Sequence, residues 1–199
     1  MTDLVELPTR ERIMDVAARQ FADNGFAGVS MRNIADAVGI QAASLYNYFN
    51  DKDALYFASI KYAFSDRLQE LEQAMQNKGS PEKRLVVLLT TLARGNIEDT
   101  VSTKLLQREL LRGDSTHQKW LSERIFKEPF HHVADLLEEI GPEGEGEQTA
   151  IYLSALTMGY AILGPLFEQF GTTAYTSDPL IFGRDIARRL INPDGRMVV

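Results

Sequence analysis

Apolar residues recur along most of the chain at the three- and four-residue intervals of amphipathic helices, and no stretch of any length alternates like a β-strand. The spacing and the turn residues between periodic stretches predict helices over residues 9–24, 51–77, 81–98, 101–111, 114–140, 149–167 and 179–191. Pro129 lies inside the longest of these patterns and should kink or break it. The sequence therefore predicts an all-α protein, with about nine helices once a further short pair is counted.

That short pair lies between residues 30 and 49. Ser30 is suited to cap a helix, Ala35 is small where a second helix must pass, and Gly39 can take the positive φ of a tight turn. Four apolar residues stand where the two helices would face each other: Ile34, Val38, Ile40 and Leu45. The pattern predicts a helix-turn-helix.

The second helix of this pair carries unusual side chains for its length. Tyr46, Asn47 and Tyr48 are crowded onto it, after a start made of small residues. An ordinary helical hairpin of the core is the alternative interpretation, but a core helix would not use two tyrosines and an asparagine in this way. A helix whose outer face meets phosphates and base edges would carry such residues, so DNA recognition is the leading hypothesis.

Residues 10–55 resemble the DNA-binding domain of the TetR/AcrR family of transcriptional regulators, without gaps. The matching residues are Thr9-Arg10, Ile13, Ala17-Ala18, Phe21, Gly25, Ser30-Met31-Arg32, Ile34-Ala35, Val38-Gly39-Ile40, Leu45-Tyr46, Tyr48-Phe49, Lys52 and Leu55. The resemblance covers about the first quarter of the chain. It implies a three-helix DNA-binding domain at residues 8–54, which a long helix joins to a helical ligand-binding and dimerisation domain at residues 55–199.

The resemblance also implies the DNA contacts. Four residues should hold phosphates: Ser30, Tyr46, Tyr48 and Lys52. Five should face base edges: Arg32, Gln41, Ala42, Ser44 and Asn47. Arg10, at the start of the first helix, is placed to reach phosphate. Ala42 and Ala43 stand where family members often carry larger polar residues, so we expect few direct base contacts there.

Residues 149–167 form an uncharged stretch of the length that spans a membrane. Ser154, Thr157 and Pro165 dilute its apolar character, and no basic flank sets an orientation. We interpret it as a soluble helix that is covered by its own core on one side and by a partner on the other. Ala155 and Gly159, one turn apart, would let a partner helix approach closely.

A homodimer follows from the resemblance, in which helices 148–169 and 179–191 pair with their copies as a four-helix bundle. The candidate interface residues are Ala155, Gly159, Ile162, Leu166, Phe182 and Ile186. The family also implies a ligand cavity, although its aromatic candidates read more simply as core residues. The candidate pocket residues are Leu89, Gln107, Trp120, Phe126, Phe130, His131 and Tyr152.

Composition and charge narrow the kinds of protein that the sequence is compatible with. The net charge is −7, but residues 8–62 balance six cations against six carboxylates, so the surplus acid lies elsewhere. A DNA-binding segment with no net charge and few cations would bind DNA weakly as a monomer, which favours a dimer. The absence of cysteine excludes disulfides and thiolate metal sites, and the N-terminus lacks the pattern of a signal peptide, so we expect a cytoplasmic protein.

No motif of catalysis, of cofactor binding or of metal binding is present in the sequence. We therefore predict no cofactor, no metal, no membrane association and no enzyme activity. The predicted function is a homodimeric transcriptional regulator, favoured as a repressor, that binds double-stranded operator DNA and is released by a small-molecule effector. A DNA-binding protein of the same fold that is controlled by a protein or nucleotide partner, or that has an architectural role, remains the alternative.

Overall fold

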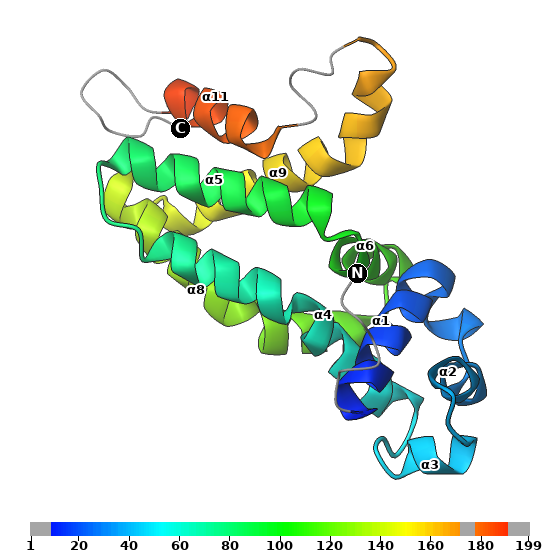
Figure 1. The fold of residues 1–199 in the computed structure, drawn as a ribbon. Helices are drawn as coiled ribbons and strands as arrows, with labels where there is room; N and C mark the ends of the chain where they lie inside the picture. Colours follow the sequence, from blue (N-terminus) through cyan, green and yellow to red (C-terminus); the bar gives the residue numbers. More distant parts are fainter. Residues whose placement is uncertain (1–8, 172–177, 191–199) are drawn as a thin grey trace. The chain divides into compact units, whose positions relative to one another are not determined.

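The computed structural model describes residues 9–171 and 178–190, which form helices joined by short turns (Figure 1). They divide into two compact units. The head comprises residues 9–66 and 100–119, and the body comprises residues 67–99, 120–171 and 178–190. The chain therefore passes between the units three times, after residues 66, 99 and 119.

The head contains the predicted helix-turn-helix. Helix α1 (Thr9–Gly28) breaks direction at Gly25, where φ is 73° and ψ is 167°, and it is followed by α2 (Met31–Val38) and α3 (Ala42–Tyr46). The first part of α4 (Lys52–Met75) and α6 (Thr100–Arg112) complete the unit, together with the start of α7 (Ser115–Leu121). Its core contains fully buried Ile13, Phe21, Ile34 and Leu45, so the small helices are fixed by burial of their inner faces.

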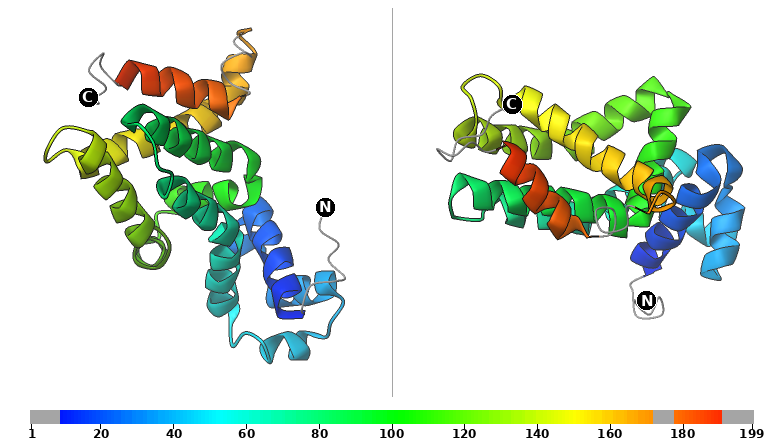
Figure 2. Two further views of the ribbon diagram at one scale, coloured as in Figure 1. Left: turned by 60° about the vertical axis from the view of Figure 1, so that its left-hand side comes forward. Right: turned by 90° about the horizontal axis from the view of Figure 1, so that it is seen from above.

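The body is built on α5 (Pro81–Glu98), α8 (Lys127–Ile140), α9 (Gly146–Glu168) and α11 (Pro179–Leu190). Helix α11 lies along α5, and α8 packs against α9, as both views of Figure 2 show. Leucine, valine, isoleucine and alanine side chains from these helices form its core: Leu71, Leu85, Leu88, Leu89, Val133, Ala134, Leu136, Leu137, Ile140, Ala150, Leu153 and Ala187.

The long pattern at residues 114–140 is broken as Pro129 requires, but one turn earlier than the proline itself. A π-helical turn, η1 (Ser122–Phe126), separates α7 from α8, and the Lys127 N–H bonds the Ser122 carbonyl five residues back. Proline has no N–H, and its ring crowds the carbonyl four residues before it, here that of Ile125. Widening of the preceding turn relieves this crowding.

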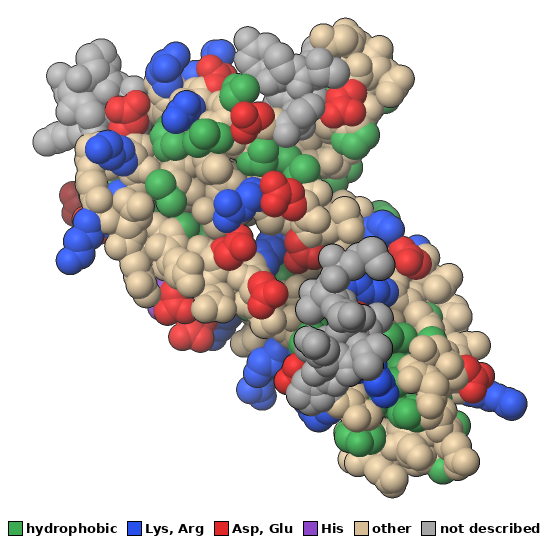
Figure 3. All heavy atoms as spheres, in the orientation of Figure 1, with side chains coloured by type: hydrophobic (Ala, Val, Ile, Leu, Met, Phe, Trp, Pro, Cys, Tyr) green, Lys and Arg blue, Asp and Glu red, His purple; other side chains and the backbone are tan. Residues whose placement is uncertain are grey.

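Helix α9 is the one described helix whose length and apolar composition would allow it to cross a membrane, and only 22% of that apolar window is buried. Its outward side chains are largely apolar: Ile151, Leu156, Ile162, Leu163 and Leu166 are all exposed. Hydrophobic side chains also reach the surface between α11 and α9 in Figure 3. This face of α9 has no cover within the described body.

Candidate DNA-binding surface

A reciprocal cap fixes the start of α2. The Ser30 hydroxyl accepts the Asn33 backbone N–H at 3.1 Å, and the Asn33 side-chain oxygen accepts the Ser30 backbone N–H at 3.0 Å. The Ser30 hydroxyl also donates to that Asn33 oxygen, at 2.5 Å. Ser30 would therefore have to give up this last bond to donate to a phosphate, because a hydroxyl has one proton.

Gly39 sets the angle between α2 and α3. It adopts φ 78° and ψ 33°, in the left-handed region, and ends α2 there as the sequence predicted. No atom lies within 4 Å of the position that a Cβ would take at Gly39, so only its backbone conformation demands glycine. Ala35 is fully buried.

The outer face of α3 collects the candidate DNA contacts. Leu45 and Phe49 are buried, while Tyr46 and Tyr48 are 50% and 43% exposed. Most other candidates around the turn are exposed as well, and two are half-buried; in chain order they are Arg32, Gln41, Ala42, Ala43, Ser44 and Asn47. Helix α3 ends at Tyr46, three residues before the end expected at residue 49, although the N–H groups of Tyr48 and Phe49 still bond to the Leu45 carbonyl.

Aromatic rings hold the two basic candidates at the edge of this surface. The Arg10 guanidinium lies 4.9 Å from the centre of the Phe49 ring, and the Lys52 ammonium lies 4.3 Å from the centre of the Phe26 ring. Asp51 caps α4, since its carboxylate accepts the Ala54 N–H at 2.7 Å. A ring beneath a cation restricts its position without neutralising it, so both charges remain available to an anion.

The role of Phe26 could not be predicted from the sequence, because the contact with Lys52 depends on how α1 packs against α4. The local sequence indicates these cation–π contacts only through an aromatic residue near each end of the helix-turn-helix.

Two further cations of the head are paired with carboxylates. Arg19 binds Asp15 at 3.0 Å, and Lys104 binds Asp23 at 2.8 Å, which lowers the pKa of the Asp23 carboxyl. Acidic and basic side chains are interspersed on the face of the head that Figure 3 shows. A single head therefore offers few uncompensated cations to DNA.

The predicted pocket residues are divided between the units. Leu89 is buried in the core of the body, with Phe130 packed against that core, and Tyr152 is exposed on α9. His131 is exposed, with Nδ1 2.7 Å from a carbonyl oxygen one turn before it, while Trp120 and Phe126 are half-buried. Gln107 belongs to the head, whereas the other six belong to the body.

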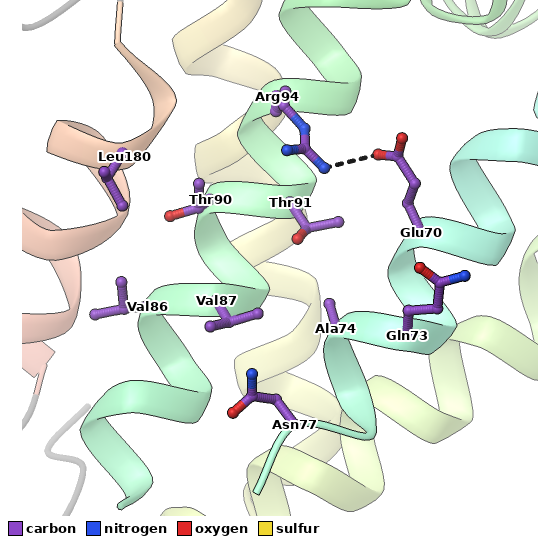
Figure 4. Close-up of a pocket in the computed structure, with 10 residues that line it drawn as sticks. All are labelled: Glu70, Gln73, Ala74, Asn77, Val86, Val87, Thr90, Thr91, Arg94 and Leu180. Atoms are coloured by element: carbon purple, nitrogen blue, oxygen red, sulfur yellow. Dashed lines mark hydrogen bonds and ion pairs between the residues drawn. The ribbon is translucent and has the colours of Figure 1, made fainter. Parts of the chain in front are cut away.

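A cavity of about 460 Å³ lies elsewhere in the body, between α4, α5 and α11 (Figure 4). The ion pair between Arg94 and Glu70, 2.9 Å long, crosses one end of it. None of the predicted pocket residues lines this cavity, whose lining residues are Glu70, Gln73, Ala74, Asn77, Val86, Val87, Thr90, Thr91, Arg94 and Leu180.

The predicted interface residues also differ in exposure. Ala155, Ile162 and Leu166 are exposed on α9, and Gly159 is half-buried there. On α11, however, Phe182 is buried with its ring 4.1 Å from that of Tyr160, and Ile186 packs against the core. Both α11 residues therefore serve their own body, and Leu180 and Ile181 are the exposed apolar residues of α11.

Comparison with known proteins agrees with this geometry. Residues 13–58 match the model of bacterial regulatory proteins of the tetR family. A 115-residue segment is 30% identical to the HTH-type transcriptional repressor Rv1474c of Mycobacterium tuberculosis. The segment spans 58% of this chain and 57% of that repressor, so the match covers little more than half of each protein.

Two solved structures share the fold. The regulator FadR of Bacillus subtilis, in complex with stearoyl-CoA, has a TM-score of 0.72 and 16% identity, over 88% of this chain and 94% of its own. AibR, in complex with isovaleryl coenzyme A and operator DNA, has a TM-score of 0.66 and 17% identity, over 78% of this chain and 86% of its own. The all-α fold with an N-terminal helix-turn-helix is thus confirmed.

The helix-turn-helix matches the model of bacterial regulatory proteins of the tetR family, and the helical body has the fold of solved transcriptional regulators. The match to the tetR family is shown for the helix-turn-helix segment, residues 13–58.

Proposed function

We propose that this chain is a homodimeric transcriptional repressor that binds double-stranded operator DNA and is released from it by a small-molecule effector. The observation that carries the proposal is the outer face of the helix-turn-helix. Tyr46, Tyr48 and Arg32 are exposed there, on helices whose inner faces are buried and whose angle is fixed by Gly39.

In this proposal Tyr46, Tyr48, Lys52 and Arg10 contact phosphates, and Arg32 reads a base. The cation–π contacts hold Lys52 and Arg10 in place before DNA arrives, which reduces the entropy lost on binding. Half-buried Ala42 and Ser44 offer little reach, so base readout depends on few side chains.

The exposed apolar face of α9 supports the homodimer. A copy of the same helix would cover Ile162 and Leu166, and Leu180 and Ile181 of α11 would take the place expected for Phe182 and Ile186. A face of this kind is also what makes α9 resemble a membrane span in composition. Two heads could then enter successive major grooves, about 34–36 Å apart.

Dimerisation can be tested by sedimentation of Leu166→Asn at micromolar protomer concentration. We expect the wild type to be dimeric and the variant to dissociate, because a buried amide would lack partners. Leu111→Asn is the matched control, since Leu111 is 88% exposed but lies on α6 in the head. A monomeric wild type, or equal dissociation of both variants, would remove the proposed interface.

The effector is proposed from the bound molecules of the two structural neighbours, which are acyl-CoA thioesters. An effector with a 100-fold preference for the DNA-free form has about 2.7 kcal/mol of coupling per site. By reciprocity, operator DNA must weaken its binding by the same factor. Titration of isovaleryl-CoA and stearoyl-CoA with and without operator tests each compound, and equal affinities rule it out as an effector.

DNA recognition is tested by selection of a high-affinity site from a random duplex library, followed by binding of Arg32→Ala. If Arg32 pairs with guanine, its loss should cost roughly 1–3 kcal/mol and relax one position of the site. Arg124→Ala, also an exposed arginine but in η1 of the body, should leave binding unchanged. Failure of the wild type to select any sequence contradicts the proposed function, and an Arg32→Ala variant that binds like wild type contradicts the base-reading role.

A further inference from the structure

Two titratable side chains are buried together in the head, outside the DNA-binding surface. Glu109 of α6 is 1% exposed and His117 of α7 is 5% exposed. Glu109 Oε2 lies 3.4 Å from His117 Nδ1, and Glu109 Oε1 accepts the Tyr56 hydroxyl at 2.5 Å. Burial, together with this hydrogen bond, raises the pKa of the Tyr56 phenol, which therefore remains a donor.

The other nitrogen of the imidazole faces the DNA-side end of α4. His117 Nε2 lies 3.4 Å from Asp53 Oδ1, and Asp53 follows Lys52 directly. The Lys52 ammonium and the Arg112 guanidinium both lie over the Phe26 ring, 4.3 and 4.7 Å from its centre. The His117 ring packs edge-on against the same ring at 5.3 Å, so one cluster joins α6 and α7 to the proposed phosphate contact.

The charges around His117 are not balanced. Three carboxylates surround it, those of Glu109, Asp53 and Asp114, and the Asp114 carboxylate accepts the His117 backbone N–H. Two cations, Arg112 and Lys52, oppose them. With a neutral imidazole the cluster has one negative charge in excess, and one more proton would neutralise it.

Hydrogen bonding identifies where this proton would be held. Arg112 Nη1 lies 3.1 Å from His117 Nδ1, so in the neutral imidazole Nδ1 accepts from the guanidinium and Nε2–H donates towards Asp53. Glu109 Oε2 is then buried with no hydrogen-bond partner. An orphaned buried carboxylate oxygen is costly, and a proton on Nδ1 would satisfy it. Arg112 would then lose Nδ1 as an acceptor and keep its bonds to the Glu109 and Asp114 carboxylates.

We propose that the Glu109–His117 pair positions the DNA-side end of α4, and that uptake of one proton by His117 strengthens operator binding. The inference rests on the proposed function. The imidazolium would bind both Glu109 and Asp53 and would therefore neutralise a carboxylate beside Lys52, where DNA phosphates are expected. Repulsion from Arg112 opposes this effect, but the Arg112 guanidinium is itself paired with the Glu109 and Asp114 carboxylates.

The sign of the pH dependence follows by linkage. If the DNA-bound head holds the proton more firmly than the free head, affinity rises as pH falls through the range in which histidine titrates. The slope is at most one proton per head. We expect binding to be roughly 3- to 10-fold tighter per head at about pH 6 than at about pH 8.

The sequence has three histidines, so the effect of His117 can be separated from that of the other two. His131 and His132 are exposed on α8 of the body. Affinity for the selected duplex is measured across this pH range at constant ionic strength. His117→Gln should remove most of the pH dependence, and His132→Gln should retain it. A wild-type slope that survives His117→Gln overturns the proposal.

A second variant separates this role from a purely structural one. Glu109→Gln keeps the acceptor for the Tyr56 hydroxyl but removes the charge that attracts the imidazolium, so it should flatten the pH profile while the head still melts cooperatively. Nitrogen NMR of the His117 imidazole in the full chain gives a readout without DNA. The Nδ1 chemical shift should differ between the wild type and Glu109→Gln, and an identical shift overturns the pairing even if no operator is ever found.

Discussion

Gly183 offers the sharpest test of how the body is packed. A Cβ at this position of α11 would lie 2.3 Å from Thr90 Oγ1 and 3.0 Å from both the Thr90 nitrogen and the Val86 carbonyl oxygen of α5. The two backbone atoms belong to a regular helix and cannot withdraw. Gly183→Ala must therefore push α11 away from α5, although alanine is the better helix former.

The expected cost is that of overpacking a close helix contact, roughly 1–3 kcal/mol. For a chain of this length each kcal/mol lowers the melting temperature by about 2–4 °C. Urea unfolding followed by circular dichroism, at one fixed protomer concentration, measures the change. Gly159→Ala is the matched control, because no atom lies within 4 Å of its Cβ position and Gly159 also stands within a helix. It should leave a single chain as stable or stabilise it by up to about 1 kcal/mol, and should weaken only a dimer.

A double variant sharpens the argument. Thr90 Oγ1 is buried without a hydrogen-bond partner, so Thr90→Ala should cost little by itself. Combined with Gly183→Ala it removes the closest clash and should restore part of the lost stability, which is a coupling that distant sites would not show. A Gly183→Ala protein as stable as wild type, or additive effects in the double variant, would refute the close packing of α11 on α5.

Three further outcomes are expected. Ser30→Ala removes the reciprocal cap with Asn33 and should lower the unfolding free energy by about 0.5–2 kcal/mol, measured by urea titration. Gly39→Ala meets no atom but keeps a left-handed φ of 78°, so it should cost roughly 1–2 kcal/mol from backbone strain alone, with operator affinity reduced more than that of Gly159→Ala. The backbone N–H groups of Gly144 and Gly146 lower the pKa of the Glu138 carboxyl, whose contribution to stability is therefore present above the ordinary glutamate value and lost as pH falls through the lowered one. Glu138→Gln should make acid unfolding shallower in that range, and an identical acid profile would show that the loop bonds do not matter.

The sequence predicted what depends on neighbours along the chain. The Ser30 cap, the Gly39 turn and the buried side of α3 follow from residues within a few positions of each other, and all three are present in the structure. The all-α class and most helix ends were accessible for the same reason. Pro129 signalled an interruption, and its upstream position follows from the carbonyl that proline displaces.

The features that could not be predicted depend on which face of a helix packs against which neighbouring helix. Both sides of α11 carry apolar residues, so spacing alone did not reveal that Phe182 and Ile186 face inward while Leu180 and Ile181 remain outside. In the same way, nothing local assigns Gln107 to the head. That placement comes from Arg108, which donates to the Ala22 and Asp23 carbonyls more than eighty positions earlier in the chain.

The threefold passage of the chain between head and body has a consequence for how such proteins can be recombined. A cut after residue 66 detaches the helix-turn-helix from residues 100–119, and with them from Lys104, Arg108 and Glu109, which bind Asp23, the end of α1 and Tyr56. A chimera that keeps this head and takes its remaining sequence from another protein of the same fold would place a foreign helix against α1. Exchange of the body therefore requires a graft in two pieces, in which residues 100–119 stay with the head and the segments on either side are replaced with the body.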